Sequence, residues 1–179
     1  MFHRSERLLL RPPWPEDWSQ VLGGIADEGV VRNLARAPWP YSPEDARAFV
    51  ELPIAFDYPR FLITRADDAS LVGCVGIDPH DGDVELGYWI ARQHWGQGYA
   101  TEACQAVLKV AQTLGHGRVV ASHFLDNPAS GRVLEKLAFQ PTGRIVERHS
   151  CGRGEAAPTA EYALSLGEGV LLQAERRAA

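Results

Sequence analysis

Residues 92–103, RQHWGQGYATEA, place two glycines directly before a run of good helix formers. The first amides of a helix have no partner within the helix, and the helix dipole adds partial positive charge there. Glycine has no Cβ to block an approaching group, and it adopts left-handed backbone conformations readily. Gly96 and Gly98, before a helix expected over residues 99–115, therefore indicate a site where backbone amides could bind the phosphates of a cofactor.

Two well-known phosphate-binding motifs do not fit this loop. A P-loop ends in Gly-Lys-Ser/Thr, whereas Gly98 is followed by Tyr99. A dinucleotide-binding fingerprint needs a third glycine after the first strand of a parallel unit. Position 101 is Thr, and the strand expected before the loop closes an antiparallel meander. A plain glycine turn between strand and helix is the alternative that involves no ligand.

Composition restricts the class of protein. The chain has 179 residues, 45% hydrophobic and 23% charged, which suits one globular domain over residues 1–179. The net charge of −5 argues against nucleic acid as the main partner. We expect no membrane segment and no secretory signal, since the N-terminal stretch has an apolar run of only three leucines. Cys74, Cys104 and Cys151 show no CxxC spacing, which favours reduced thiols in a cytoplasmic protein and no metal site.

Alternating and helical patterns predict the elements that would position the loop. Helices are expected over parts of 16–34 with a break at Gly23-Gly24, from a cap at Ser42, over 99–115 and over 127–139. Strands are expected at 6–11, 60–65, 70–78, 84–91, 118–125, 142–149 and 159–166, with a loop or hairpin at 151–158. This order predicts an α+β fold with a mixed, mostly antiparallel sheet flanked by helices. Strands 84–91 and 118–125 would be parallel neighbours joined by a right-handed crossover.

Two segments resemble one enzyme family. VELGYWIARQHWGQGYATEA resembles the core of the GNAT N-acetyltransferases, whose Gln/Arg-x-x-Gly-x-Gly/Ala signature is matched by Gln93, Gly96 and Gly98. DNPASGRVLEKLAF is similar to the second family segment, with Ala138 where the family usually has glycine. The matched positions there are Asn127, Ser130, Glu135, Lys136 and Phe139. The opening ERLLLRPPWPEDW is similar to the RimJ/RimL-like branch, which acetylates protein N-termini.

The resemblance implies the single-domain GNAT (acyl-CoA N-acyltransferase) fold with acetyl-CoA as cosubstrate and no metal. Strands 84–91 and 118–125 would splay apart, so that the pantetheine arm pairs with the exposed strand edge. The loop amides would bind the pyrophosphate, and a primary amine would be the acceptor. The implied cofactor-binding residues are Trp89, Ile90, Ala91, Gln93, His94, Trp95, Gly96, Gln97, Gly98, Tyr99, Ala100, Asn127 and Ser130.

Direct attack of an amine on a thioester needs a proton acceptor, an oxyanion donor and a proton for the thiolate. A backbone N–H of strand 84–91 is the expected oxyanion donor. Family position makes Ser130 the candidate acid, and Glu85 is the candidate base, directly or through water. The alternative bases are Glu147, His149, His123 and a chain of waters. The resemblance implies that the aromatic loop 37–41, with Phe56 and Tyr58, shapes the acceptor site; the alternative is that Trp39 and Tyr41 only cover the core.

Several functions stay open at this stage. The acceptor could be a protein N-terminus, including that of a ribosomal protein, or a small amine such as a polyamine, an amino acid or an aminoglycoside. A non-catalytic acyl-CoA-binding module would use the same loop. A scaffold that dimerises through the tail 168–179, which could be helical or frayed, would bind no coenzyme. A homodimer is compatible with any of these functions.

Overall fold

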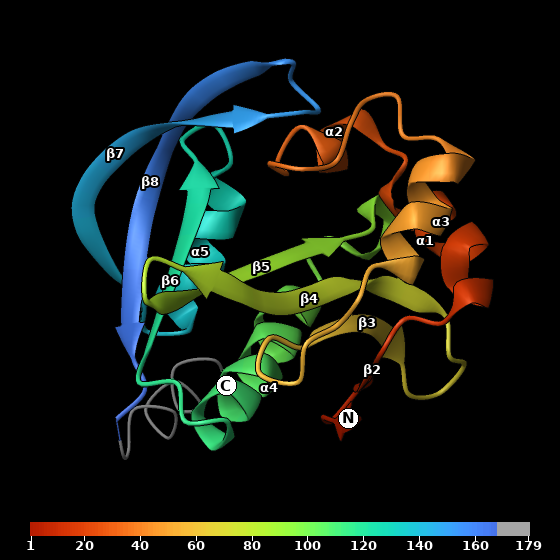
Figure 1. Cartoon of the computed structure of the whole chain (residues 1–179), viewed down its shortest axis with the longest axis horizontal. Coiled ribbons are helices and arrows are strands. Elements are labelled where there is room, and N and C mark those ends of the chain that lie inside the picture. Colours follow the sequence, from red (N-terminus) through yellow and green to blue (C-terminus); the bar gives the residue numbers. More distant parts are fainter. Residues whose placement is uncertain (168–179) are drawn as a thin grey trace.

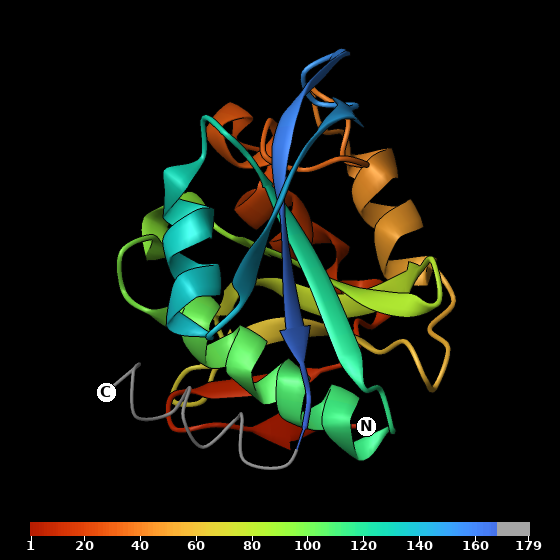
Figure 2. The ribbon, with the colours of Figure 1, turned by 90° about the vertical axis from the view of Figure 1, so that its left-hand side faces the viewer.

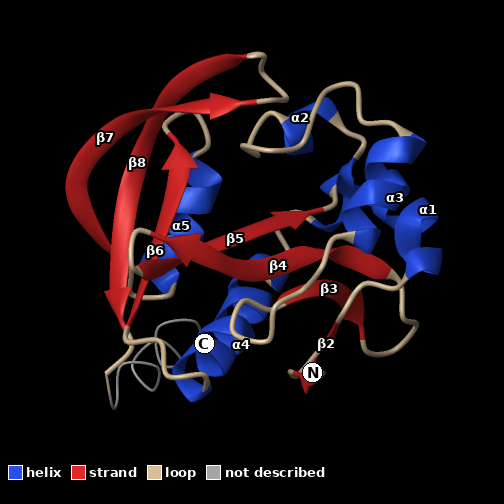
Figure 3. Cartoon of the chain, in the orientation of Figure 1, coloured by secondary structure: helices blue, strands red, loops and turns tan. Residues whose placement is uncertain are grey.

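All strands of the described chain join one sheet. The computed structural model describes residues 1–167. The eight strands of these residues lie in the order β1-β2-β3-β4-β5-β6-β8-β7 (Figure 3). Their bounds are β1 His3–Arg4, β2 Leu8–Arg11, β3 Arg60–Arg65, β4 Leu71–His80, β5 Asp83–Ile90, β6 Arg118–Phe124, β7 Gln140–Ser150 and β8 Glu155–Ser165. Every neighbouring pair is antiparallel except β5 and β6. The expected mixed, mostly antiparallel sheet is therefore confirmed.

The parallel pair separates soon after it begins. β5 and β6 are paired only at Val84↔Val119 and Glu85↔Val120. Both strands run on, to Ile90 and Phe124, without further pairing between them. Figure 1 shows the two arrows diverging, with β5 leading toward the helices on one side and β6 rising beside α5. The splay expected from the sequence is present, and it leaves one edge of β5 without a partner strand.

Helices cover both faces of the sheet. They are α1 Trp18–Ile25, α2 Glu28–Val31, α3 Pro43–Glu51, α4 Tyr99–Thr113 and α5 Pro128–Lys136, with short 3-10 turns at Pro15–Asp17 and Arg92–His94. One core packs residues of α4 and α5 against the sheet, and a second core packs α1, α2 and α3 against the other side of β4 and β5. Figure 2 shows α4 and α5 together on one side, with β7 and β8 crossing in front of β6.

Helix α4 follows the expected pattern closely. Ala103, Val107, Val110 and Ala111 are all buried, as their three- and four-residue spacing predicts. The helix ends at Thr113, and Gly115 just beyond it has a φ of +88°, a left-handed stop that suits glycine. The packing of α4 against the sheet thus fixes the first turn of this helix at the open end of the splay.

Two expected boundaries are wrong. Helix α1 runs through Gly23 and Gly24 and ends at Ile25. Gly24 is tolerated because it lies against the Trp89 ring, where a Cβ would come within 3.3 Å of a ring carbon. The hairpin expected at 151–158 is confirmed, but its second strand begins at Glu155 and not at residue 159, with Pro158 in register with Glu147. The tail 168–179, expected as a helix or a frayed end, lies outside the described residues.

Over residues 1–167, no helix is long and apolar enough to cross a membrane. The same residues contain no group of three or more His, Cys, Asp or Glu side chains arranged to hold a metal ion.

Candidate active site

The glycine loop presents uncapped amides at the start of α4. Gly98 is the N-cap residue, with a φ of +81° and no side-chain hydrogen bond to the first turn. Gly96 has a φ of +75°, and a Cβ built on it would meet nothing within 4 Å. The first amides of α4 are therefore free of a side-chain cap, and the space beside Gly96 is open. Both features fit an anion held by backbone N–H groups.

Side chains within the loop fix its shape. The indole Nε1 of Trp95 donates to the carbonyl oxygen of Ile90 over 2.7 Å, which ties the loop to the end of β5. The guanidinium of Arg92 lies 4.3 Å from the centre of the Trp95 ring. The side-chain amide of Gln97 donates to the carbonyl oxygen of Gln93 over 3.1 Å. Gln93 thus contributes its backbone to the loop, while its own side chain is exposed.

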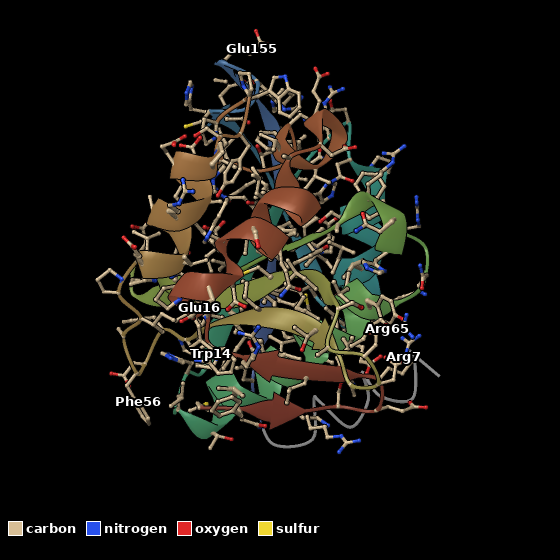
Figure 4. All side chains as sticks on the ribbon, turned by 90° about the vertical axis from the view of Figure 1, so that its right-hand side faces the viewer. Arg7, Trp14, Glu16, Phe56, Arg65 and Glu155 are labelled. Carbon is tan, nitrogen blue, oxygen red and sulfur yellow. The ribbon has the colours of Figure 1, made fainter. Side chains whose placement is uncertain are left out.

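Arg7, which the sequence did not single out, braces the loop from the N-terminal strand region. Its Nη1 donates to the carbonyl oxygen of Gln97 over 3.0 Å, and its Nε donates to Glu102 over 2.8 Å. Ser5 also donates to Glu102. Burial raises the pKa of Glu102, but the hydrogen bonds from Ser5 and Arg7 outweigh it and hold that pKa below its usual value. Figure 4 shows Arg7 and Arg65 side by side on this side of the molecule.

Most other residues expected to bind the cofactor point their side chains into the cores. Trp89 and Ala91 are buried in the core formed with α1, α2 and α3, while Ile90 and Tyr99 are buried in the core formed with α4 and α5. His94 stacks edge-on against Tyr99, at 6.0 Å between ring centres, and Ala100 packs against the α4 core. The buried residues among these can contribute mainly backbone groups to a ligand, whereas His94 is only half-buried.

The backbone of β5 has groups to offer on its open edge. The amide of Ala91 donates to Val72 of β4 over 2.9 Å. Residues along an antiparallel strand alternate between directing their backbone N–H and C=O groups toward one neighbour and toward the other. The backbone groups of Trp89, like those of Ala91, therefore face β4, while those of Tyr88 and Ile90 face β6. Because β6 has already separated there, the amides of Tyr88 and Ile90 face the splay. A backbone N–H of this strand is thus placed as the sequence led us to expect for an oxyanion donor.

Ser130 lies beside a half-buried tyrosine at the splay. Its hydroxyl oxygen is 2.7 Å from the hydroxyl of Tyr88, one of them donating to the other. Burial raises the pKa of Tyr88 well above its usual value, so this phenol keeps its proton. Ser130 stands in the first turn of α5, where its amide donates to the Asn127 side chain over 3.4 Å. Asn127 therefore caps α5, as expected. Tyr88 could have been noticed only from the placement of two segments 42 residues apart.

Glu85 is held in an ion pair. Arg148 of β7 contacts both of its carboxylate oxygens, with 2.7 Å from Nη2 to Oε2, and Ser122 of β6 donates to Oε1 over 3.1 Å. Burial raises the pKa of Glu85, but Arg148, and after it His80 and Ser122, more than offset this, and the pKa lies below its usual value. A carboxylate held in this way is a weaker base than a free one. The geometry assigns it first to joining β5, β6 and β7.

The alternative bases are less well placed. Glu147 and His149 are exposed and flank Arg148, so strand alternation points them away from the side on which Arg148 meets Glu85. His123 hydrogen-bonds the carbonyl oxygen of Phe124 through Nδ1 at 2.9 Å. Its ring lies 5.5 Å from the Tyr162 ring and against Gly131, which places it in packing between α5 and the sheet.

The expected aromatic acceptor site is only partly assembled. Tyr41 is buried in the core with α1 and α3, while Trp39 is exposed. Phe56 and Tyr58 are not part of this region: Tyr58 packs against His116, and Asp57 bonds His116 through its carbonyl oxygen. His116 follows the far end of α4, so the length of that helix, roughly 20 Å, separates these residues from the glycine loop. Their contacts place them near the far end of α4, and their part in the acceptor site stays a prediction.

The β7–β8 turn is fastened to the segment after α2. The hydroxyl of Ser150 donates to the carbonyl oxygen of Leu34 over 2.7 Å, and the amide of Cys151 donates to Ala35 over 2.9 Å. Arg153 donates to the carbonyl oxygen of Arg32 over 2.7 Å. We call residues 150–153 with 31–35 the clasp. In Figure 1 it joins the upper ends of β7 and β8 to α2, across the side on which the splay opens.

Comparison with known proteins agrees with this architecture. A family model described as an acetyltransferase (GNAT) domain matches residues 7–140. The uncharacterized N-acetyltransferase YoaA of Bacillus subtilis is 32% identical over 168 residues, covering 89% of this chain and 94% of that protein. A GNAT-family acetyltransferase from Bacillus anthracis superposes with a TM-score of 0.81 at 27% identity, covering 93% of this chain and 99% of that one.

A third relative has a narrower name. The ribosomal-protein-serine acetyltransferase of Escherichia coli is 34% identical over 83 residues, which is 44% of this chain and 45% of that protein.

The chain belongs to the GNAT acetyltransferase family. It is an N-acetyltransferase, with the fold expected from the glycine loop and the Asn127–Phe139 segment.

Proposed function

We propose that this enzyme transfers the acetyl group of acetyl-CoA to the N-terminal amine of a protein or peptide, as a member of the RimJ/RimL-like branch. The observation that carries the transfer is the splay of β5 and β6, which has uncapped amides of α4 at one end and the Tyr88–Ser130 hydroxyl pair beside it. The choice of acceptor is supported by the relative named as a ribosomal-protein-serine acetyltransferase and by the opening segment 6–18.

The residues of the loop fit acetyl-CoA. The left-handed Gly96 and Gly98 leave the amides at the start of α4 open to a pyrophosphate. The unpaired edge of β5, at Tyr88 and Ile90, can hydrogen-bond the amide groups of the pantetheine arm as an added strand would. When bound, acetyl-CoA supplies the activated acetyl thioester. The chain's own part is to hold that thioester beside Ser130 and to exclude water from it.

The chemistry is one acyl exchange. The amine lone pair forms the new N–C bond to the acetyl carbon, the C–S bond breaks, and its electron pair leaves with sulfur. The amine nitrogen loses one proton and the sulfur gains one, so charge and protons balance. A β5 amide facing the splay would donate to the carbonyl oxygen as it becomes negative.

Ser130 is the proposed proton donor to sulfur. Replacing Ser130 with Ala should lower kcat by about tenfold to a hundredfold, because the leaving thiolate loses its donor. The Kd of acetyl-CoA should change little, since the loop amides provide most of the binding. Steady-state kinetics with calorimetric titration of acetyl-CoA measure the two effects separately. Unchanged turnover would remove Ser130 from the mechanism.

Glu85 remains the proposed base only if it acts through water, because Arg148 and Ser122 occupy its carboxylate. Glu85→Gln keeps the shape and removes the charge. The pH–rate profile should lose its acidic limb if Glu85 accepts the amine proton. A profile of unaltered shape would leave that proton to a chain of waters.

The deciding experiment is release of thiol from acetyl-CoA by the purified protein, with pooled acceptors. One pool contains peptides that differ in their first residue, and the others contain polyamines, amino acids and aminoglycosides. We expect release with the peptide pool. Release only with a small-amine pool would keep the acetyltransferase and replace the acceptor. Binding of acetyl-CoA without release from any pool would favour a non-catalytic acyl-CoA-binding module.

A further inference from the structure

Gly87 lies in the middle of a strand, and the fold itself does not require a glycine at this position. It lies inside β5, is exposed, and does not have the left-handed backbone that favours glycine. A Cβ built on Gly87 would meet nothing within 4 Å. Glycine weakens a strand, because it has no side chain to pack and loses more conformational freedom than other residues.

Other glycines in this part of the sheet have a packing reason. A Cβ on Gly73 would lie 2.1 Å from the carbonyl oxygen of Trp89. A Cβ on Gly76 would lie 2.9 Å from the carbonyl oxygen of Pro59. Close approach of a neighbouring backbone therefore forces glycine at both positions. Gly87 has no such neighbour, so its empty space needs another explanation.

The empty space lies next to the reacting groups. Gly87 directly precedes Tyr88, and strand alternation points their side positions to opposite faces of β5. The Tyr88 face leads to Ser130 and α5, while the Gly87 face also carries Glu85 and Trp89. Trp89 is covered by α1, and Glu85 is engaged by Arg148. Between these two covered positions, Gly87 is the exposed point of the face.

The two flanks of Gly87 differ. Its partner on β4 is Gly76, whose side of the strand is covered by backbone, since a Cβ there would lie 2.9 Å from the carbonyl oxygen of Pro59. On the other side, β6 has already separated, because the last β5–β6 pair is Glu85↔Val120. The open space beside Gly87, which we call the Gly87 hollow, therefore adjoins the splay on the face opposite the Tyr88–Ser130 pair.

We infer that this hollow receives the carbon that bears the acceptor's amine, which makes Gly87 the residue that limits acceptor size. The inference rests on the proposed acetyl transfer and deepens it. With the sulfur on the Ser130 side of β5, the amine approaches the thioester from the Gly87 side. Atoms added at position 87 then compete with the acceptor and leave the acetyl-CoA contacts in place. The acceptors that fit are primary amines with a small group at that carbon, such as N-terminal glycine, alanine or serine.

The test uses Gly87→Ala and Gly87→Val, with Gly23→Ala as the matched control. Gly23 likewise has nothing within 4 Å of a built Cβ and no left-handed backbone, but it lies in α1. Acceptor peptides differ only in their first residue, which is Gly, Ser or Thr. If only a small-amine pool is accepted, amines unbranched or methylated at the amine-bearing carbon replace the peptides.

We expect Gly87→Ala to lower kcat/KM by about tenfold for the Ser peptide and less for the Gly peptide. Gly87→Val should lower both by about a hundredfold or more. The Kd of acetyl-CoA and the thermal midpoint should not fall, and Gly23→Ala should match the wild type. Wild-type kcat/KM in Gly87→Val, or loss of acetyl-CoA affinity instead of acceptor turnover, would overturn the inference while acetyl transfer stands. No transfer by the wild type with any pool would overturn the proposed function, and the inference with it.

Discussion

At the scale of single residues, the Tyr88–Ser130 pair joins two hydroxyls of unequal acidity. A phenol is a stronger acid than an aliphatic alcohol, so Tyr88 is the better donor of the two, and Ser130 is then left with its own proton to direct elsewhere. Ser130 stands in the first turn of α5 beside the splay, so that proton is available to a leaving sulfur. Tyr88 acts here as a positioning residue.

Removal of the Tyr88 hydroxyl should therefore act through Ser130. Tyr88→Phe should lower kcat by about threefold to tenfold, less than Ser130→Ala, and the double variant should be no slower than Ser130→Ala alone. The Kd of acetyl-CoA reports any wider damage to the splay. Additive losses in the double variant would show that the two hydroxyls work independently, contrary to this assignment.

Glu85 contributes to the free energy of unfolding in a way that depends on pH. Its pKa in the folded protein lies below the ordinary value of 4.5, so the Glu85–Arg148 pair stabilises the fold above that pH and loses its effect as pH falls through the lower, folded value. Glu85→Gln should lower the unfolding free energy by about 1–2 kcal/mol at pH 7, since Arg148 is partly exposed to screening. The difference from the wild type should shrink below about pH 4.

Urea unfolding at pH 7 and pH 3.5 measures this difference. Arg148→Met serves as the matched variant, because it removes the partner and leaves the carboxylate. An equal loss at both pH values would mean that packing, and not the ion pair, accounts for the effect.

At the scale of elements, the sequence predicted best where local pattern and burial coincide. Helix α4 and strands β3, β4 and β5 were predicted within a few residues, because their apolar spacing matches the face they bury. Gly23-Gly24 is the exception, because the pair of glycines predicts a break in the helix. A tertiary contact decides the outcome, since Gly24 lies against the Trp89 ring within α1.

The candidate site was predictable to a similar extent. The glycine loop, Asn127 and Ser130 carry a local motif and were found from it. Tyr88, Arg148 and Arg7 were missed because each acts through a partner at least 42 residues away in the chain. The part of Phe56 and Tyr58 in the acceptor site stays a prediction, because aromatic composition gives no information about which end of α4 a loop reaches.

The two ends of α4 offer a matched comparison, because one glycine precedes the helix and another follows it. Gly96 and Gly115 both have left-handed backbones, and a Cβ on either would meet nothing within 4 Å. Alanine at either position should lower the unfolding free energy by about 1 kcal/mol, which is the cost of that conformation for a residue with a Cβ. Only Gly96→Ala should also weaken acetyl-CoA, by about tenfold or more, because only its Cβ enters the space offered to the pyrophosphate.

Calorimetric titration of acetyl-CoA into both variants measures that difference. Equal affinities would remove the loop from phosphate binding and restore the interpretation of a plain glycine turn.

At the scale of the whole molecule, the site lies between parts that are distant in the chain. The N-terminal segment braces the loop through Arg7, and the clasp joins the β7–β8 turn to the segment after α2. Arg32 and Arg153 both pair with Asp126, just after β6, so the same charge links the clasp to the strand that forms one wall of the splay. An acceptor approaching Gly87 is therefore framed by segments from both ends of the described chain.

Gly152 is the residue that lets the clasp close. A Cβ there would lie 2.5 Å from Cγ1 of Val31 and 2.9 Å from the Val31 carbonyl oxygen, so Gly152→Ala should loosen the turn from α2. We expect faster amide hydrogen exchange in residues 31–35 and 150–154. The kcat/KM for the acceptor should fall by about tenfold, while the Kd of acetyl-CoA, which binds on the loop side, should be unchanged. Gly167→Ala, where a Cβ has nothing within 4 Å, is the control. Faster exchange at the clasp with unaltered acceptor kinetics would show that the clasp supports the fold without shaping the acceptor site. The segments from both ends of the described chain would then have no part in acceptor recognition.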